Sequence, residues 1–226
     1  RKALAMELSS TAIDLPAGAK DVHVRDRYTL PLDVYVVSVY PHAHYLGKDL
    51  RGWATLPDGS ERELMHIPSW DFNWQEEYFY REPIALPKDS VVHMRWEFDN
   101  SAENPFNPAN PPVRVRHGYQ SLDEMAELQL QVLTSEWDRP ILWHDFVQLS
   151  LTIDQQNVER GLAEMPKNQK LRDEAFKYCL RRRDAAGALA HAQKLLALAP
   201  QSSEALTRLG QALVMNQELA QAVNVL

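Results

Sequence analysis

The stretch that decides the fold is residues 34–44, which read VYVVSVYPHAH. Its first seven residues are mostly β-branched or aromatic, a composition that favours a strand. Residues 91–98 (VVHMRWEF) and residues 128–133 (LQLQVL) have the same character, and the second of these alternates between apolar and polar side chains. Alternation with a period of two is typical of a half-buried strand. The pattern therefore predicts several short strands in this part of the chain.

Turn signals separate these strands. Residues 56–60 (LPDGS) and 86–90 (LPKDS) combine proline with aspartate, glycine or serine, and residues 99–112 form a loop rich in asparagine and proline. These residue types favour turns, and proline also resists helix formation. Short strands separated by turns, with no helical period between them, predict an antiparallel sandwich or barrel. We expect this β domain to occupy residues 1–152.

The sequence changes to a helical period after about residue 155, where proline and glycine become rare. Shifting the chain by 34 residues places Ala188 on Ala222, and a Leu209-Gly210 pair lies between them. This period resembles a tetratricopeptide (TPR) array, in which pairs of helices stack into a solenoid. We expect residues 153–226 to form TPR-like helical repeats, truncated within the second repeat. The resemblance implies that these repeats bind a protein partner through their concave surface.

The composition excludes several classes of protein. Of 226 residues, 45% are hydrophobic and 24% charged, with a mean hydropathy of −0.42, which excludes a disordered chain. No apolar run approaches the roughly 20 residues that a membrane-spanning helix needs. The net charge of −7 argues against a nucleic-acid-binding surface. The single cysteine, Cys179, cannot form an intrachain disulfide and is interpreted as a small buried apolar residue.

Two histidines, His42 and His44, end the strand-forming stretch. Residues two apart in a strand point to the same face, so both imidazoles can reach one metal ion. The same pair can equally be two surface or core histidines, because imidazole serves all of these roles. A metal site at this position needs a third ligand.

Met125 is the candidate for that ligand. In residues 121–132 the alternation places Ala126 and Leu128 on the apolar face, and Met125 on the polar face with Glu127. One interpretation is an exposed methionine at the rim of the sheet, since single apolar residues are common at surfaces. The other interpretation is a thioether ligand. Two imidazoles and one thioether suit copper, and Cu(I) in particular.

Four motifs, taken in order, resemble one family. They are residues 41–48 (PHAHYLGK), residues 70–75 (WDFNWQ), residues 99–101 (DNS) and residues 123–125 (DEM). Together they resemble the C-terminal domain of the copper type II, ascorbate-dependent monooxygenases, the family of peptidylglycine α-hydroxylating monooxygenase and dopamine β-monooxygenase. The likeness is closer to the bacterial relatives, in which such a domain can be joined to TPR repeats. It spans roughly residues 20–135.

The resemblance implies a jelly-roll-like β-sandwich with one mononuclear copper, held by His42, His44 and Met125. In that family this copper activates O2, and the oxygen species abstracts hydrogen from a C–H bond of an organic substrate, which is then hydroxylated. Ascorbate or another reductant supplies the electrons. Asp123 and Glu124 are candidates to support the ligands, because metal-bound histidines usually donate their second ring N–H to an acceptor. The resemblance further implies an extracytoplasmic location, periplasmic or secreted.

Some features depart from the family pattern. The hydroxylases need a preceding domain with a second copper bound by three histidines, so we expect such a domain, and any signal peptide, upstream of Arg1. In the peptide hydroxylase, an arginine and a tyrosine bind the substrate. This chain has Tyr40 and Gln129 at the corresponding positions, which argues against a peptide-carboxylate substrate. The other histidines lack a partner at ligand spacing and are interpreted as structural or surface residues: His23, His66, His93, His117, His144 and His191.

Two other functions remain open at this point. One is a copper-binding protein for storage, delivery or sensing, without turnover. The other is a TPR scaffold in which the sandwich is purely structural. Aromatic residues that bury a large area are usually core, and we interpret the following set in that way rather than as a substrate platform. The set is Trp53, Trp70, Phe72, Trp74, Tyr78, Phe79, Tyr80 and Trp96.

Overall fold

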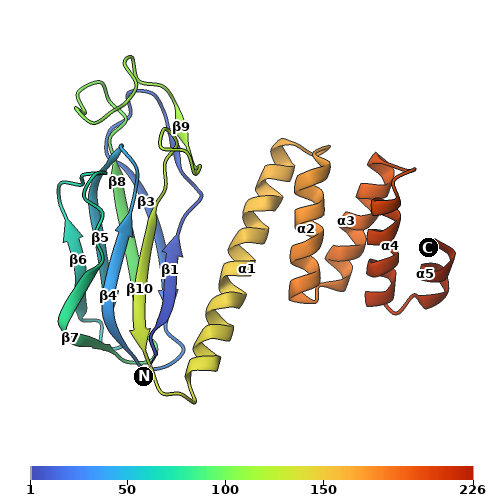
Figure 1. Cartoon of the computed structure of the whole chain (residues 1–226), viewed down its shortest axis with the longest axis horizontal. Helices are drawn as coiled ribbons and strands as arrows, with labels where there is room; N and C mark the ends of the chain where they lie inside the picture. Colours follow the sequence, from blue (N-terminus) through green and yellow to red (C-terminus); the bar gives the residue numbers. More distant parts are fainter. Residues whose placement is uncertain (1, 226) are drawn as a thin grey trace. The chain divides into compact units, whose positions relative to one another are not determined.

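The computed structural model describes residues 2–225, apart from the side chains of residues 152–154 and 156. The chain divides into two compact units, Arg1–His144 and Asp145–Leu226, which are described separately. Figure 1 shows strands in the first unit and helices in the second. The predicted boundary after residue 152 falls inside helix α1 (Arg139–Glu164).

The first unit is an antiparallel β-sandwich, as predicted. One sheet has the strand order β1-β10-β4-β7 and consists of β1 (Leu4–Ser9), β10 (Glu127–Leu133), β4 (Val34–His42) and β7 (Tyr78–Leu86). The other has the order β3-β8-β5-β6 and consists of β3 (Val22–Thr29), β8 (Val91–Phe98), β5 (Gly47–Thr55) and β6 (Glu61–Ile67). A short pair joins β2 (Asp14–Leu15) to β9 (Val115–Arg116). The three strands predicted from the sequence are β4, β8 and β10, and all three are confirmed.

Alternating side chains from the two sheets form the core. The predicted apolar face of β10 is confirmed, since Leu128 and Leu130 are buried. From the other sheet, Trp96 and Phe98 are fully buried. The sheets approach closely at Gly52, where a Cβ atom would lie 2.7 Å from Cδ2 of Leu128. Each large apolar side chain buried in this way stabilises the fold by about 1.5–3 kcal/mol.

The loops follow the turn chemistry of the sequence. Gly59 has a φ of 83°, a left-handed conformation that glycine adopts without strain. Residues 99–112 contain no helix, as predicted, and are anchored by the buried side chain of Asn100. Its Nδ2 donates to the carbonyl oxygens of Leu15 (3.0 Å) and Val113 (2.7 Å). One buried amide therefore ties this loop to two other segments.

The second unit is helical. After α1 come α2 (Gln169–Arg182), α3 (Ala185–Leu198), α4 (Ser203–Met215) and α5 (Leu219–Val225). Polar side chains cap α2, α3 and α4 by accepting a backbone N–H of the first turn, and these caps are Asn168, Asp184 and Ser202. Phe176, Cys179, Ala188, Ala192 and Ala212 form the fully buried core, which confirms the prediction for Cys179.

Helix α1 begins at Arg139, within the segment predicted to be β. Oγ of Ser135 accepts the backbone N–H of Asp138 (3.0 Å) and donates to its carboxylate (2.6 Å). Pro140 then occupies the first turn, where its missing N–H costs nothing. These local signals start the helix before its period becomes visible. None of the described helices is long and apolar enough to cross a membrane.

Candidate metal site

Strand β4 brings the two predicted histidines together. His42 is its last residue and pairs with Glu127 of β10, and His44 follows two positions later. The ring centroids are 5.2 Å apart and the ring planes are at 82°, so the rings meet edge to face. His44 is buried and His42 is partly buried. The spacing of the histidines in the sequence therefore predicted a real contact.

One hydrogen bond fixes the tautomer of each ring. Nδ1 of His42 lies 2.5 Å from Oε1 of Gln75, whose Nε2 donates to the carbonyl oxygen of Phe72 (2.8 Å). Nδ1 of His44 lies 3.0 Å from the carbonyl oxygen of Asp123. Because both oxygens are acceptors only, each Nδ1 must carry the proton and donate it. Each Nε2 therefore keeps the lone pair that a metal would need.

The environment also favours the neutral form of His42. Burial lowers the pKa of His42, the hydrogen bond to Gln75 opposes this, and the nearby His44 lowers the pKa further. A neutral imidazole is the form that ligates a metal, because a proton on Nε2 would block the lone pair.

Met125 is buried, with 8% of its surface exposed, so its predicted place on the polar face is wrong. It lies before β10 begins at Glu127, and strand alternation therefore does not apply to it. The two residues before it, Asp123 and Glu124, both hydrogen-bond to His44. The segment that carries the methionine thus lies against the segment that carries the histidines.

Glu124 joins these two segments inside the core. Its side chain is fully buried, and its two carboxylate oxygens accept the backbone N–H of His44 (3.0 Å) and of Leu46 (3.3 Å). Burial raises its pKa to about 8, although backbone N–H donors from His44, Leu46 and Met125 lower it. The sequence suggested a supporting role for this residue, and the structure shows the bonds that it makes.

Two tryptophans bind the carbonyl side of the same segment. Nε1 of Trp96 donates to the carbonyl oxygen of His42, and Nε1 of Trp70 donates to that of His44, both at 2.9 Å. Both are core residues, as predicted. The same prediction is wrong for Trp74, Phe79 and Tyr78, which are 68%, 66% and 39% exposed. Sequence reasoning did not identify Trp70 and Trp96 as residues of the site, because their partners lie far away along the chain.

His117 lies beside the site, although the sequence indicated only an isolated histidine. Its backbone forms a bridge with Glu124. Burial lowers the pKa of His117, Asp123 raises it, and His44 lowers it again. The electrostatic environment of this ring therefore depends on both the segment with Asp123 and the segment with His44. No sequence spacing marks His117, because pairing of the backbone places it there.

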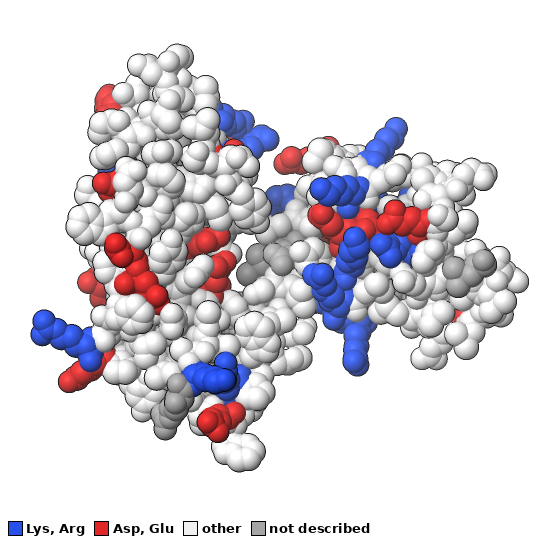
Figure 2. Space-filling model, in the orientation of Figure 1, with Lys and Arg blue, Asp and Glu red and all other residues white. Residues whose placement is uncertain are grey.

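The outer face of the first sheet continues from His42. Tyr40 and Gln129 are paired in register on β4 and β10, and Gln129 donates to a carboxylate oxygen of Glu7 (3.0 Å). A hollow of about 300 Å³ is lined in part by Tyr40, Glu77 and Gln129. β1, β4 and β10 contain no lysine or arginine, and Figure 2 shows acidic but no basic side chains over the middle of these strands. These three strands offer no cation to a substrate carboxylate.

The donor atoms define the chemical class of the site. Among the described residues, no three histidine, cysteine, aspartate or glutamate side chains are arranged to hold a metal ion. The predicted set contains only two side chains of these types, and its third member is a thioether. Two imidazole nitrogens with free lone pairs and a buried methionine fit a copper ion better than a hard cation such as magnesium. Neither a protein-family model nor a curated protein sequence matches the chain.

Proposed function

We propose that the β unit is a copper-binding, O2-activating domain of the ascorbate-dependent monooxygenase type, with a jelly-roll-like sandwich. His42, His44 and Met125 would hold the ion. One observation carries the proposal: the bonds to Gln75 and to the carbonyl of Asp123 leave a lone pair on Nε2 of both rings. A thioether in the ligand set favours Cu(I), the form that reacts with O2.

When bound, copper supplies one-electron chemistry with O2, and in the family that the chain resembles this leads to hydroxylation of a substrate C–H bond. The residues of the chain prepare the site. Gln75 and Asp123 orient the imidazoles, and burial keeps His42 neutral by lowering its pKa. The ring of Phe72 forms a T-shaped contact with that of His44, with 5.7 Å between the centroids.

The proposal includes the partners that the resemblance implies. O2 and an unidentified organic substrate react at the site, and ascorbate or another reductant supplies electrons. A separate domain with a second copper, bound by three histidines, relays one of these electrons. An extracytoplasmic location, periplasmic or secreted, suits this chemistry. The absence of basic residues from β1, β4 and β10 supports a substrate other than a peptide carboxylate.

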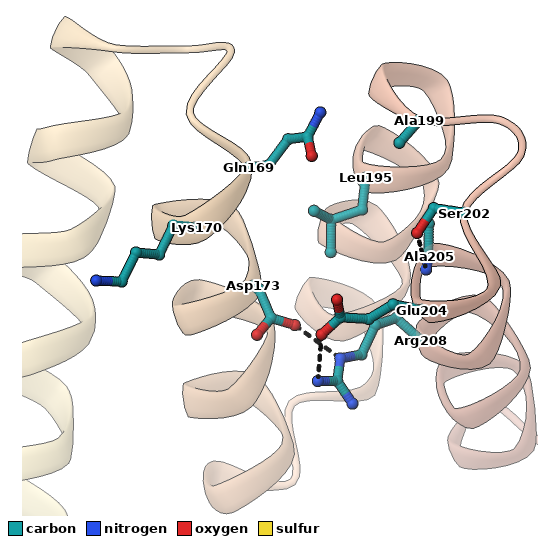
Figure 3. Close-up of a pocket in the computed structure, with 9 residues that line it drawn as sticks. All are labelled: Gln169, Lys170, Asp173, Leu195, Ala199, Ser202, Glu204, Ala205 and Arg208. Atoms are coloured by element: carbon teal, nitrogen blue, oxygen red, sulfur yellow. Dashed lines mark hydrogen bonds and ion pairs between the residues drawn. The ribbon is translucent and has the colours of Figure 1, made fainter.

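For the helical unit we propose TPR-like repeats that bind a protein partner. Helix α4 begins 34 residues after α2, and α5 begins 34 residues after α3, which is the TPR period. A hollow of about 370 Å³ is lined by residues of α2, α3 and α4 (Figure 3). Within it, Arg208 pairs with Asp173 (2.7 Å) and Glu204 (3.3 Å). This mixed-charge hollow is the candidate partner site.

Copper titration followed by electron paramagnetic resonance tests the metal site. We expect about one Cu(II) per chain in the wild type, and loss of that site in His42→Ala. His93→Ala is the matched control, because His93 is another partly buried histidine of the sandwich, stacked on Trp53 at 4.9 Å. The control should bind copper like the wild type. Failure of the wild type to bind, or equal binding by His42→Ala, would overturn the proposal.

A second measurement separates an enzyme from a copper carrier. The copper-loaded protein would be given ascorbate and a three-histidine copper domain, and O2 consumption would be followed with a panel of organic substrates. Substrate-dependent consumption supports a monooxygenase. Stoichiometric copper binding without any consumption would instead favour storage, delivery or sensing.

A further inference from the structure

The backbone around His44 is bound on both sides by side chains from distant parts of the sequence. Its N–H donates to Glu124, which is 80 positions away. Its carbonyl oxygen accepts from Nε1 of Trp70, which is 26 positions away. Glu124 is fully buried and Trp70 is 3% exposed, so neither bond competes with water. Hydrogen bonds shielded in this way are strong and define one geometry.

Glu124 acts on more than one backbone group. Its second oxygen accepts the N–H of Leu46, so one carboxylate binds two alternate N–H groups of the segment that contains the histidines. Its own backbone lies between Asp123, whose carbonyl receives Nδ1–H of His44, and Met125. Glu124 therefore links the His44 segment directly to the residues that flank the methionine.

Burial of the Glu124 carboxyl group lowers the free energy of unfolding unless its hydrogen bonds are fully replaced. A carboxyl group buried without full compensation destabilises a protein, because it loses its hydration. The three backbone N–H groups around Glu124 compensate that loss only while the segments keep their present separation. An amide in place of the carboxylate would present an NH2 group to one of these N–H donors, and two donors cannot bond to each other. The site thus demands an oxygen with a free lone pair on both branches of the side chain.

We propose that Glu124, together with Trp70, is a positioning residue of the metal site, which holds His44 and Met125 at ligating separation before any metal arrives. The inference rests on the proposed copper function and adds the residues that build the site in the metal-free protein. Preorganisation of this kind raises affinity, because the ordering of the ligands is already complete in the free protein.

Glu124→Gln tests the proposal in two ways. In the metal-free protein, hydrogen exchange of the His44 and Leu46 amides should be slow in the wild type and faster at one or both amides in the variant. In the metal-bound protein, competition with a Cu(I) chelator should give an affinity about 10–100-fold lower than that of the wild type. The Cu(II) resonance spectrum should also change, because the nitrogen ligands move.

Asp26→Asn is the matched control. The carboxylate of Asp26 is partly buried and, like that of Glu124, accepts two backbone N–H groups, those of Ser9 (3.1 Å) and Arg27 (2.8 Å). Neither of these bonds involves residues 41–46 or 123–125. We expect it to lower thermal stability without changing copper affinity or the spectrum. A purely structural role for Glu124 would make the two variants behave alike.

Trp70→Phe keeps the test decisive if Glu124→Gln fails to fold. It removes the bond to the carbonyl of His44 and retains an aromatic ring, and we expect a smaller loss of Cu(I) affinity with the same spectral change. Wild-type affinity and spectrum in these variants would overturn the positioning role alone. A wild type that binds no copper, yet shows slow amide exchange, would overturn the proposed function and the positioning role with it.

Discussion

The helices of the second unit begin at local caps, whereas the candidate site of the β unit depends on bonds between distant parts of the sequence. In the β unit, Glu124 and Trp96 reach His44 and His42 across 80 and 54 positions of the chain. In the helical unit, Asp184 caps α3 by binding the N–H of Gly187, three positions away, and small side chains such as Ala188 pack around Phe176. Local sequence therefore marks where these helices begin, whereas the candidate site exists only once distant segments have packed.

The comparison predicts that damage to the helical core leaves the metal site intact. Phe176→Ala removes a fully buried ring, and we expect the free energy of unfolding of the helical unit to fall by about 3–5 kcal/mol. Urea unfolding followed by far-UV circular dichroism measures this loss. Copper affinity should stay at the wild-type value, and its loss would show that the two units do not behave separately.

Gly47→Ala should damage the site from within the β unit. A Cβ atom there would lie 2.7 Å from Cδ1 of Trp70 and 3.0 Å from Cβ of Ala43, so the indole must move away from the carbonyl of His44. We expect a loss of about 1–3 kcal/mol in stability, as for other overpacked cores, together with weaker copper binding. The control is Gly161→Ala, whose Cβ would meet only the flexible side chain of Leu171, at 3.2 Å. Equal copper affinity in both variants would contradict the role given to Trp70.

Loss of a helix cap should have a smaller and purely local effect. Asp184→Ala removes the acceptor for the N–H of Gly187 at the start of α3. We expect the helical unit to lose about 1 kcal/mol, the usual cost of a missing N-cap. Thermal unfolding of that unit measures the loss, and a change at the copper site would be unexpected.

An effect of similar size, limited to one pH range, is expected in the β unit. Burial, with the nearby Glu7, raises the pKa of Glu127 to about 7. A carboxyl group with a raised pKa stabilises the folded state at low pH and loses that contribution as pH rises through 7. Glu127→Gln should therefore match the wild type near pH 4.5 and exceed it above pH 7 by about 1 kcal/mol, since this partly exposed group is screened.

Melting temperatures of both proteins across this pH range give the measurement. Glu82→Gln, at an exposed position of β7, is the control for the loss of one carboxyl group from this sheet. A stability difference between Glu127→Gln and the wild type that is independent of pH would contradict the assignment of the effect to ionisation of Glu127.

Much of the fold could be predicted from local sequence patterns. The β-branched runs predicted β4, β8 and β10, and the apolar alternation of β10 identified Leu128 and Leu130 as core residues. The start of α1 was missed because its helical period is weak there, although Ser135 three positions before Asp138, followed by Pro140, is a recognisable start signal.

The candidate site could be predicted from the sequence only in part. The spacing of His42 and His44 predicted their contact, although only His42 lies in β4. The burial of Met125 and the place of His117 depend on pairing between segments that are far apart in the sequence. The bond from Trp70 has the same origin, because its partner is a backbone carbonyl that no sequence motif reports.

The ligand set itself is tested most directly by X-ray absorption spectroscopy of the Cu(I)-loaded protein. We predict two imidazole nitrogens and one sulfur around each copper in the wild type. In Met125→Leu the sulfur signal should disappear, while the buried leucine preserves the volume of the site. A wild-type spectrum without sulfur, or an unchanged sulfur signal in Met125→Leu, would contradict the assignment of His42, His44 and Met125 as the copper ligands.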